Sequence, residues 1–272
     1  MSFVFKGFGV NLKPSFFVMC VLLVLLGRGG ELCILILSVT LHEGAHILTA
    51  ALFGARAESV TVTPIGQQAT IQGLERISFF RRMLVVMAGP GVNAALWLLF
   101  GSRINLALFM LNMLPVYPLD GGRMLHYILG YCLGVLRANR VQSFLSRAVA
   151  TAIFLLGFVQ PVLYGYNVSL LCIGLYLIKI NKREYINMTF AFYRSVMYRS
   201  DKKVLTVRSF MAGGNIGLKT LVYRLGWDYY TVVYVRDPKG GCAGSISEEE
   251  LIGYIMRRNI NHSLKDVLND SI

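Results

Sequence analysis

Charged side chains are scarce in this chain of 272 residues. They make up 15% of it, whereas an ordinary globular domain has about 25%. Acidic residues are the scarcest, with 14 Asp and Glu in total. Hydrophobic residues instead account for 55%, and the mean hydropathy is +0.57. This balance excludes a disordered chain, a disulfide-rich secreted scaffold and a compact cytosolic enzyme, and it indicates a membrane protein.

Paired cysteines are also lacking. The chain has five cysteines, an odd number, and none forms a CxxC pair. We therefore expect small buried apolar side chains rather than disulfides or thiolate metal ligands. The net charge is +13, but no basic groove interleaved with aromatic residues accompanies it. We assign this charge to loop topology and anionic lipid, and expect no nucleic-acid partner.

Apolar segments recur through residues 1–180 and predict a transmembrane domain there. They run at roughly 15–27, 31–53, 83–101, 104–116, 124–136, 148–163 and 167–180. Prolines and glycines within 104–136 favour one interrupted crossing, which gives about six spans. No small-residue cleavage site follows the first run, so we expect an uncleaved span. Eleven Lys or Arg on one side against two on the other predict that both termini are cytoplasmic.

Two further regions differ in pattern from the apolar segments. Residues 57–72 alternate apolar and polar side chains around Pro64, which predicts a membrane-edge β-hairpin. This hairpin is either a solvated loop or an edge that holds an extended peptide by strand addition. Residues 181–202 are basic and aromatic, as an interfacial linker would be. Residues 203–272 alternate strands and helices, with the first strand expected at Val204–Val207, and predict a small cytoplasmic α/β domain.

The second apolar segment contains the sequence His42-Glu43-Gly44-Ala45-His46. Histidines at positions i and i+4 share one helix face, so both can bind one zinc ion, and Glu43 beside them can act as a base. The alternative is a chance match with satisfied core histidines. Ionisable residues within a span cost about 2.5–3.5 kcal/mol each, so three in five residues favour the metal.

A catalytic zinc site has three protein ligands and one open position. The candidate third ligand is Asp120, 74 residues after His46, in a stretch broken by prolines and glycines that lets a carboxylate turn inward. His126 is the alternative, six residues further along a helix-like run. We favour Asp120.

The motifs together resemble the site-2 protease family of intramembrane zinc metalloproteases. HEGAH is followed by N-x-x-P-x-x-P-x-D-G at 112–121, and Ala88–Asn93 resembles the middle motif of that family. The resemblance covers residues 31–130. It implies that His42, His46 and Asp120 bind zinc and that Glu43 is the catalytic base. It also implies site-shaping or substrate-contacting roles for Asn93, Asn112, Pro115 and Pro118.

The tail at 203–272 resembles a single CBS (cystathionine-β-synthase) domain, which is typical of a sporulation branch of that family. The resemblance implies cleavage of the sigma-K precursor near the cytoplasmic face of the bacterial membrane that surrounds the forespore. It further implies inhibitory membrane proteins as partners, ATP or another adenine nucleotide at the tail, and pairing of tails in a homo-oligomer. The rival functions are a metal-dependent membrane binding or transport protein and an inactive pseudoprotease.

Overall fold

The computed structural model describes residues 2–5, 8–63, 66–74, 77–164, 168–197, 206–226, 229–237, 240–258 and 261–270. The chain forms two compact units. The first comprises Met1–Pro115 and Leu119–Met124, and the second comprises Val116–Pro118 and Leu125–Ile272. Helix α5 (Asp120–Leu133) begins in the first unit and ends in the second.

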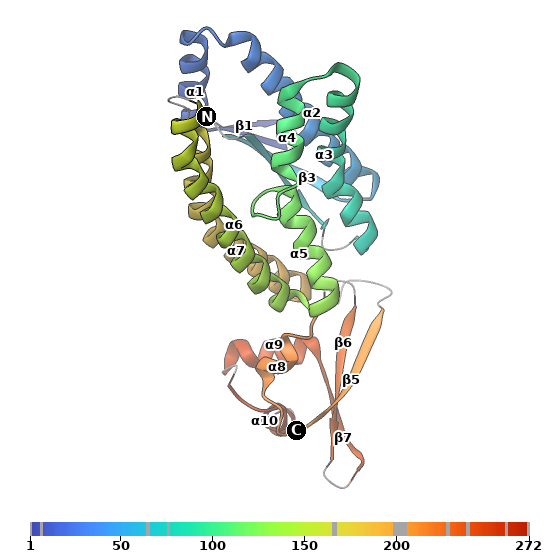
Figure 1. Ribbon diagram of the computed structural model, residues 1–272. Coiled ribbons are helices and arrows are strands. Elements are labelled where there is room, and N and C mark those ends of the chain that lie inside the picture. The colour runs from blue at the N-terminus through green and yellow to red at the C-terminus, as the bar shows by residue number, and fades with distance from the viewer. Residues whose placement is uncertain are drawn as a thin grey trace. The chain divides into compact units, whose positions relative to one another are not determined.

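The first unit contains four helices ahead of α5 (Figure 1). They are α1 (Pro14–Leu25), α2 (Gly29–Leu52), α3 (Phe79–Phe100) and α4 (Arg103–Asn112). Helix α3 stops at Gly101, whose φ of 64° is the left-handed conformation that glycine adopts without strain. The hydroxyl of Ser102 then accepts a hydrogen bond from the Asn105 N–H and caps α4.

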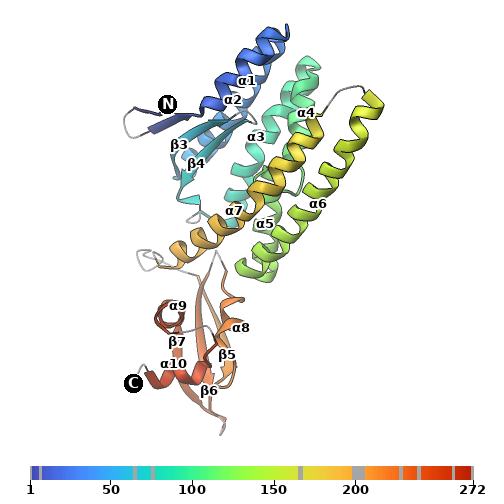
Figure 2. The same cartoon turned by 90° about the vertical axis from the view of Figure 1, so that its left-hand side faces the viewer.

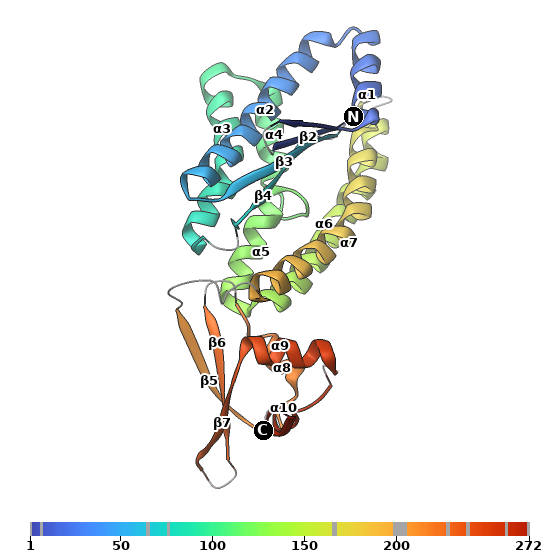
Figure 3. The same ribbon diagram turned by 180° about the vertical axis from the view of Figure 1, so that it is seen from behind.

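A four-stranded sheet lies against α2 in the same unit (Figures 2 and 3). Its order is β1 (Ser2–Phe5), β2 (Phe8–Leu12), β3 (Arg56–Thr63) and β4 (Gly66–Gln72), and only the β2–β3 pair is parallel. The predicted hairpin is confirmed as β3 and β4, while Pro64 and Ile65 of its turn lie outside the described residues. Strands β1 and β2 were not predicted. Strand β4 is at the edge of the sheet.

The second unit contains two long antiparallel helices that lie side by side (Figure 1). They are α6 (Val135–Tyr164) and α7 (Ser169–Met197). Buried amides join them, because Asn139 donates to the Tyr185 carbonyl and Asn181 donates to the Ser143 carbonyl. Helix α7 continues unbroken through residue 181. The predicted domain boundary at 180/181 therefore does not coincide with the end of a helix. This boundary and the interfacial linker at 181–202 stay predictions.

The tail is a three-stranded sheet with its helices on one face (Figure 1). The elements are β5 (Val207–Gly213), α8 (Leu218–Val222), β6 (Tyr230–Arg236), β7 (Cys242–Ser247), α9 (Glu248–Arg257) and α10 (Leu264–Asp270). Strands β5 and β6 are parallel, and β6 and β7 are antiparallel. The core between sheet and helices contains Leu218, Leu251 and Leu264, all fully buried.

The first strand of the tail differs from the expected position. The expected strand at Val204–Val207 lies partly outside the described residues, and β5 starts where that prediction ends. Its position is set by pairing with β6, in the register Val207 to Tyr230. Its burial pattern is mostly exposed, so the apolar alternation that marks a half-buried strand is weak there.

Three of the described helices are long and apolar enough to cross a membrane: Gly29–Leu52, Phe79–Phe100 and Val135–Val162. Apolar side chains on them face outward, including Leu52 at 75% exposure and Leu98 at 73%. Such outward apolar surface is what lipid covers, so membrane localisation is supported. Six crossings and cytoplasmic termini stay predictions.

The cysteine prediction needs a correction. All five cysteines are free thiols, as expected, but none is buried. Four are exposed, and Cys20 is intermediate. For the four cysteines in apolar helical segments, the reason is that an apolar residue in a membrane helix is as stable on the outward surface as in the core. Cys242 lies instead at an exposed position of β7 in the tail.

Candidate metal centre

Two histidines of α2 and one carboxylate of α5 converge in the first unit. His42 and His46 are one helical turn apart, and their Nε2 atoms lie 3.1 Å from each other. Oδ2 of Asp120 lies 3.0 Å from the Nε2 atom of His42 and 3.2 Å from that of His46. All three side chains are buried, and they form a group that could hold a metal ion.

These separations fit a zinc ion. Zinc binds nitrogen and oxygen at about 2.0–2.2 Å in a tetrahedron, which places neighbouring ligand atoms about 3.3 Å apart. The structure has 3.0–3.2 Å between the three donor atoms. Three protein ligands leave a fourth position open, as in catalytic zinc sites. Zinc is therefore supported by the donor set itself.

The space between the donors is kept open by Gly89 of α3. A Cβ atom at position 89 would lie 2.2 Å from Nε2 of His46 and 2.6 Å from Nε2 of His42. The first distance is close to the length of a zinc–nitrogen bond, and the second is about 0.5 Å longer. A side chain at this position would thus stand where the ion belongs.

Helix α3 also contacts the far side of both imidazoles. Nδ1 of His46 donates to the Val85 carbonyl at 2.7 Å, and the amide of Asn93 lies 2.9 Å from Nδ1 of His42. Bonds of this kind fix the tautomer and the ring orientation of metal-binding histidines. The Nε2 atoms of both rings are left directed at Asp120.

Glu43 lies beside the ligands and is held by the sheet. Its Oε2 atom accepts a hydrogen bond of 3.1 Å from the backbone N–H of Ala69 on β4. One turn earlier on α2, the hydroxyl of Thr40 accepts a bond of 3.0 Å from the amide of Gln67, also on β4. The edge strand is therefore joined to the motif helix at two points.

The connection that carries Asp120 is tightly folded. A Cβ atom at Gly121 would lie 2.4 Å from the Met113 carbonyl oxygen, so only glycine permits this close return of the chain. Asp120 therefore stands at the first position of α5. Asn112 ends α4, and Pro115 and Pro118 lie in the connection. Their proposed roles are not tested by these positions.

The structure brings together His42, His46, Asp120 and Asn93, and it places Glu43 at their side. His126 is fully buried further along α5 and is not one of the three clustered ligands. Sequence reasoning missed the contributions of Val85, Gly89 and Ala69. Val85 and Ala69 act through backbone groups, so residue type gave no signal for them, whereas Gly89 lies within the Ala88–Asn93 motif and only its role was missed.

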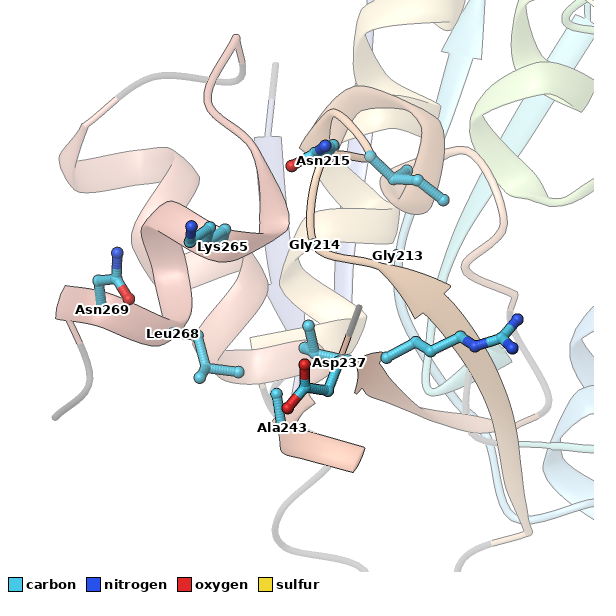
Figure 4. Close-up of a pocket in the computed structure, with 11 residues that line it drawn as sticks. Gly213, Gly214, Asn215, Asp237, Ala243, Lys265, Leu268 and Asn269 are labelled. Carbon is cyan, nitrogen blue, oxygen red and sulfur yellow. The ribbon is translucent and has the colours of Figure 1, made fainter. Parts of the chain in front are cut away.

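The tail contains a separate cavity of about 520 Å³. Figure 4 shows Gly213 at the end of β5 with Gly214 and Asn215 following it, and Lys265 and Asn269 of α10 on the other side of the cavity. Its other polar lining residues are Arg236 and Asp237. The lining therefore holds two cations, one carboxylate and two amides, so an anionic ligand would meet Arg236 and Lys265 but also the like charge of Asp237.

Part of the chain is similar to a known peptidase family and to known proteins. The profile of peptidase family M50 matches residues 94–156. A zinc metalloprotease of Methanocaldococcus jannaschii is 26% identical over 159 residues, which cover 53% of this chain and 45% of that protein. Stage IV sporulation protein FB of Bacillus subtilis is 26% identical over 148 residues, covering 48% and 51% respectively. These matches support a metalloprotease of the site-2 type, peptidase family M50.

A solved site-2 protease from Methanocaldococcus jannaschii has a similar fold. Its TM-score is 0.53 at 23% identity, and the match covers 68% of this chain and 95% of that one. The matches to the two curated relatives span about half of their length. The M50 profile covers Asp120 but not the histidine motif of α2. The grouping of the two histidines with Asp120 therefore rests on the distances in the structure and not on the profile match.

Proposed function

We propose that this chain is an intramembrane zinc metalloprotease that hydrolyses a peptide bond near the cytoplasmic membrane face of a membrane-associated precursor protein. One observation carries the proposal: two histidines and one aspartate converge at zinc-binding separations, with a carboxylate, Glu43, next to them on the same helix. A purely structural zinc site has four protein ligands and needs no such neighbour.

The chemistry divides between the ion and the residues around it. Zinc bound by this set would act as a Lewis acid, lowering the pKa of a bound water towards about 7 and polarising the scissile carbonyl. Glu43 would take the proton from the attacking water and pass it to the leaving amine. The Ala69 N–H engages one oxygen of Glu43, and the second oxygen is the one that receives the proton.

The depth of the site supports cleavage close to the membrane surface. His46 precedes Phe53, which caps the end of α2, by seven residues. At a rise of about 1.5 Å per residue, that is about 10 Å along the helix. A helical substrate must also unwind, because its carbonyls are engaged in the helix ladder. The open edge of β4 beside Glu43 offers backbone groups that can hold an extended segment.

The sigma-K precursor is the first substrate to test. The support is the similarity to stage IV sporulation protein FB, together with the order of the three sequence motifs. If this substrate is correct, the chain acts in the membrane around the forespore, as a multi-pass protein with cytoplasmic termini. Inhibitory membrane proteins would then be its expected partners.

The tail would serve regulation. Its cavity, which Arg236 and Lys265 help to line, is a candidate site for ATP or another adenine nucleotide. A tail that resembles a single CBS domain would complete such a site by pairing with a second copy, in a homo-oligomer. This arrangement supports a role for nucleotide in controlling the membrane unit.

The rival functions do not require Glu43 as a base. A metal-dependent binding or transport protein uses the three ligands but needs no base, and a pseudoprotease retains partners without hydrolysis. The hydrogen bond from β4 to Glu43 favours the protease, because it orients a carboxylate that neither rival uses.

The test is co-expression of the full chain with the sigma-K precursor, comparing wild type with Glu43→Gln and measuring cleavage and bound zinc together. We expect both proteins to retain zinc and only the wild type to cleave. Equal cleavage by both would contradict the role of Glu43. Zinc binding without cleavage by either would favour the binding or transport function.

A further inference from the structure

We propose that helix α3 completes the metal site without supplying a ligand. Gly89, which has no side chain, leaves space for the ion, and Asn93 holds the imidazole ring of His42 in its metal-binding orientation. This inference rests on the zinc site of the proposed function. It assigns two separate roles to α3. One is to leave space for the ion, and the other is to orient the ring of His42.

The volume argument follows from the position of the missing side chain. A methyl group at position 89 would lie within 2.7 Å of three atoms of the two imidazole rings. Both rings are held from behind by α3, His46 at the Val85 carbonyl and His42 at Asn93. Neither ring can turn away without breaking a buried hydrogen bond. An alanine at position 89 would therefore exclude the ion.

Gly91 supplies a natural contrast on the same helix. A Cβ atom there meets nothing within 4 Å. Both glycines lie within α3, so the conformational effect of a substitution by alanine is similar at the two positions. The two positions differ in what surrounds them, and this isolates the effect of the added methyl group on the metal site.

The orientation argument concerns the amide of Asn93. This side chain is fully buried. Its Nδ2 atom lies 2.9 Å from Nδ1 of His42, and its Oδ1 atom has no hydrogen-bond partner among the described residues. A histidine that binds metal through Nε2 carries its proton on Nδ1 and donates it. A half-turn of the amide brings Oδ1 to that proton, so the metal-bound site satisfies the oxygen that is otherwise unpaired.

Asn93 thus acts as a positioning residue through His42. Asn93→Leu keeps a similar volume and removes the acceptor, whereas Asn93→Asp keeps an acceptor oxygen. Asn105 of α4 is an equally buried asparagine in the same unit, hydrogen-bonded to Ser102 rather than to a histidine. Asn105→Leu is therefore the matched control for loss of a buried amide.

The experiment measures zinc binding by the full chain in detergent micelles, with no substrate present. The protein is stripped with a chelator and titrated with Zn²⁺ against a chromophoric competitor. We expect Gly89→Ala to lose measurable binding and Gly91→Ala to bind as wild type. Asn93→Leu should bind about 10- to 100-fold more weakly, with Asn93→Asp and Asn105→Leu close to wild type.

Co²⁺ in place of zinc supplies a second measurement, because its visible absorption reports the coordination geometry. Asn93→Leu should change the Co²⁺ spectrum, while Asn105→Leu should leave it unaltered. Thermal unfolding of each metal-free variant shows whether it is folded. If Gly89→Ala does not fold, the methyl group conflicts with the fold rather than with the ion and the volume claim is overturned, while the Asn93 pair still decides the orientation claim.

The outcomes separate this inference from the function on which it rests. A wild type that binds no zinc would overturn both. A wild type that binds zinc, with Gly89→Ala and Asn93→Leu binding equally well, would overturn the inference alone. Loss of affinity in Asn93→Asp as large as in Asn93→Leu would contradict the role of the acceptor oxygen.

Discussion

The backbone N–H of Ala69 donates a hydrogen bond of 3.1 Å to the carboxylate of Glu43, across 26 positions of sequence. The donor belongs to the edge strand β4, and the acceptor belongs to the helix that carries both histidine ligands. A bond to an ionised acceptor is about twice as strong as one between neutral groups. The sheet therefore holds the proposed base in place through a backbone group, which among the common residues only proline removes.

Replacing Ala69 with proline tests this hold. Proline lacks the N–H and is tolerated on edge strands. Loss of a hydrogen bond to a charged group is worth about 1.5–3 kcal/mol, so we expect the rate of peptide cleavage to fall about 10- to 100-fold while zinc remains bound. Ile71→Pro, two residues along β4, is the control. Equal rates in the two proline variants would mean that the Ala69 N–H is not needed.

The sequence was sufficient to predict the histidine pair, Glu43 and Asp120 as one site, because each carries a distinctive side chain within an apolar setting. The hairpin followed from its alternation. Strands β1 and β2 were missed. The parallel pairing of β2 with β3 spans about 50 residues and leaves no local signal, whereas β1 and β2 form a short local antiparallel pair that was overlooked. The roles of Val85 and Ala69 depend on backbone atoms. They become visible only once the helices and the sheet are placed.

Removing the carboxylate ligand distinguishes the two candidates for the third position. Asp120→Ala should lose zinc and cleavage together, because two imidazoles alone do not complete a catalytic zinc site. His126→Gln should keep zinc, since His126 lies outside the ligand cluster. Metal content of the purified proteins is the measurement. A loss of zinc in His126→Gln with retention in Asp120→Ala would reverse the assignment.

The tail cavity can be tested by its cations. Lys265 lines the cavity, whereas Lys219 on α8 is exposed and does not line it. If the cavity binds the phosphates of ATP, Lys265→Ala should weaken binding of a labelled ATP analogue about tenfold or more, as expected for a lost charge-assisted hydrogen bond. Lys219→Ala should bind as wild type. Unchanged affinity in Lys265→Ala would place any nucleotide site elsewhere.

The closing helix of the tail carries a pH-dependent cap. The carboxylate of Asp266 accepts bonds of 2.7 Å from both the backbone N–H and the hydroxyl of Ser263. These bonds hold the pKa of Asp266 below its usual value. Because the folded-state pKa is the lower one, the stabilisation is present at neutral pH and is lost as the pH falls through that pKa.

Thermal unfolding of the full chain at pH 7 and near pH 3 measures this effect. Wild type should lose stability on acidification, and Asp266→Ala should lose less, because it lacks the group that titrates. Asp270→Ala, which removes a carboxylate that pairs with Arg258 at the end of the same helix, should behave as wild type. An Asp266→Ala variant as sensitive to acid as wild type would show that the cap contributes nothing.

The central claim is that one zinc ion, held by His42, His46 and Asp120, is required for peptide hydrolysis by this chain. The most direct measurement is cleavage of the precursor by purified, metal-stripped protein as zinc is added back in known amounts. The account predicts no cleavage without metal and a rise in rate that ends at one zinc per chain. Cleavage at full rate by the stripped protein, or a fully occupied site that never cleaves, would contradict it.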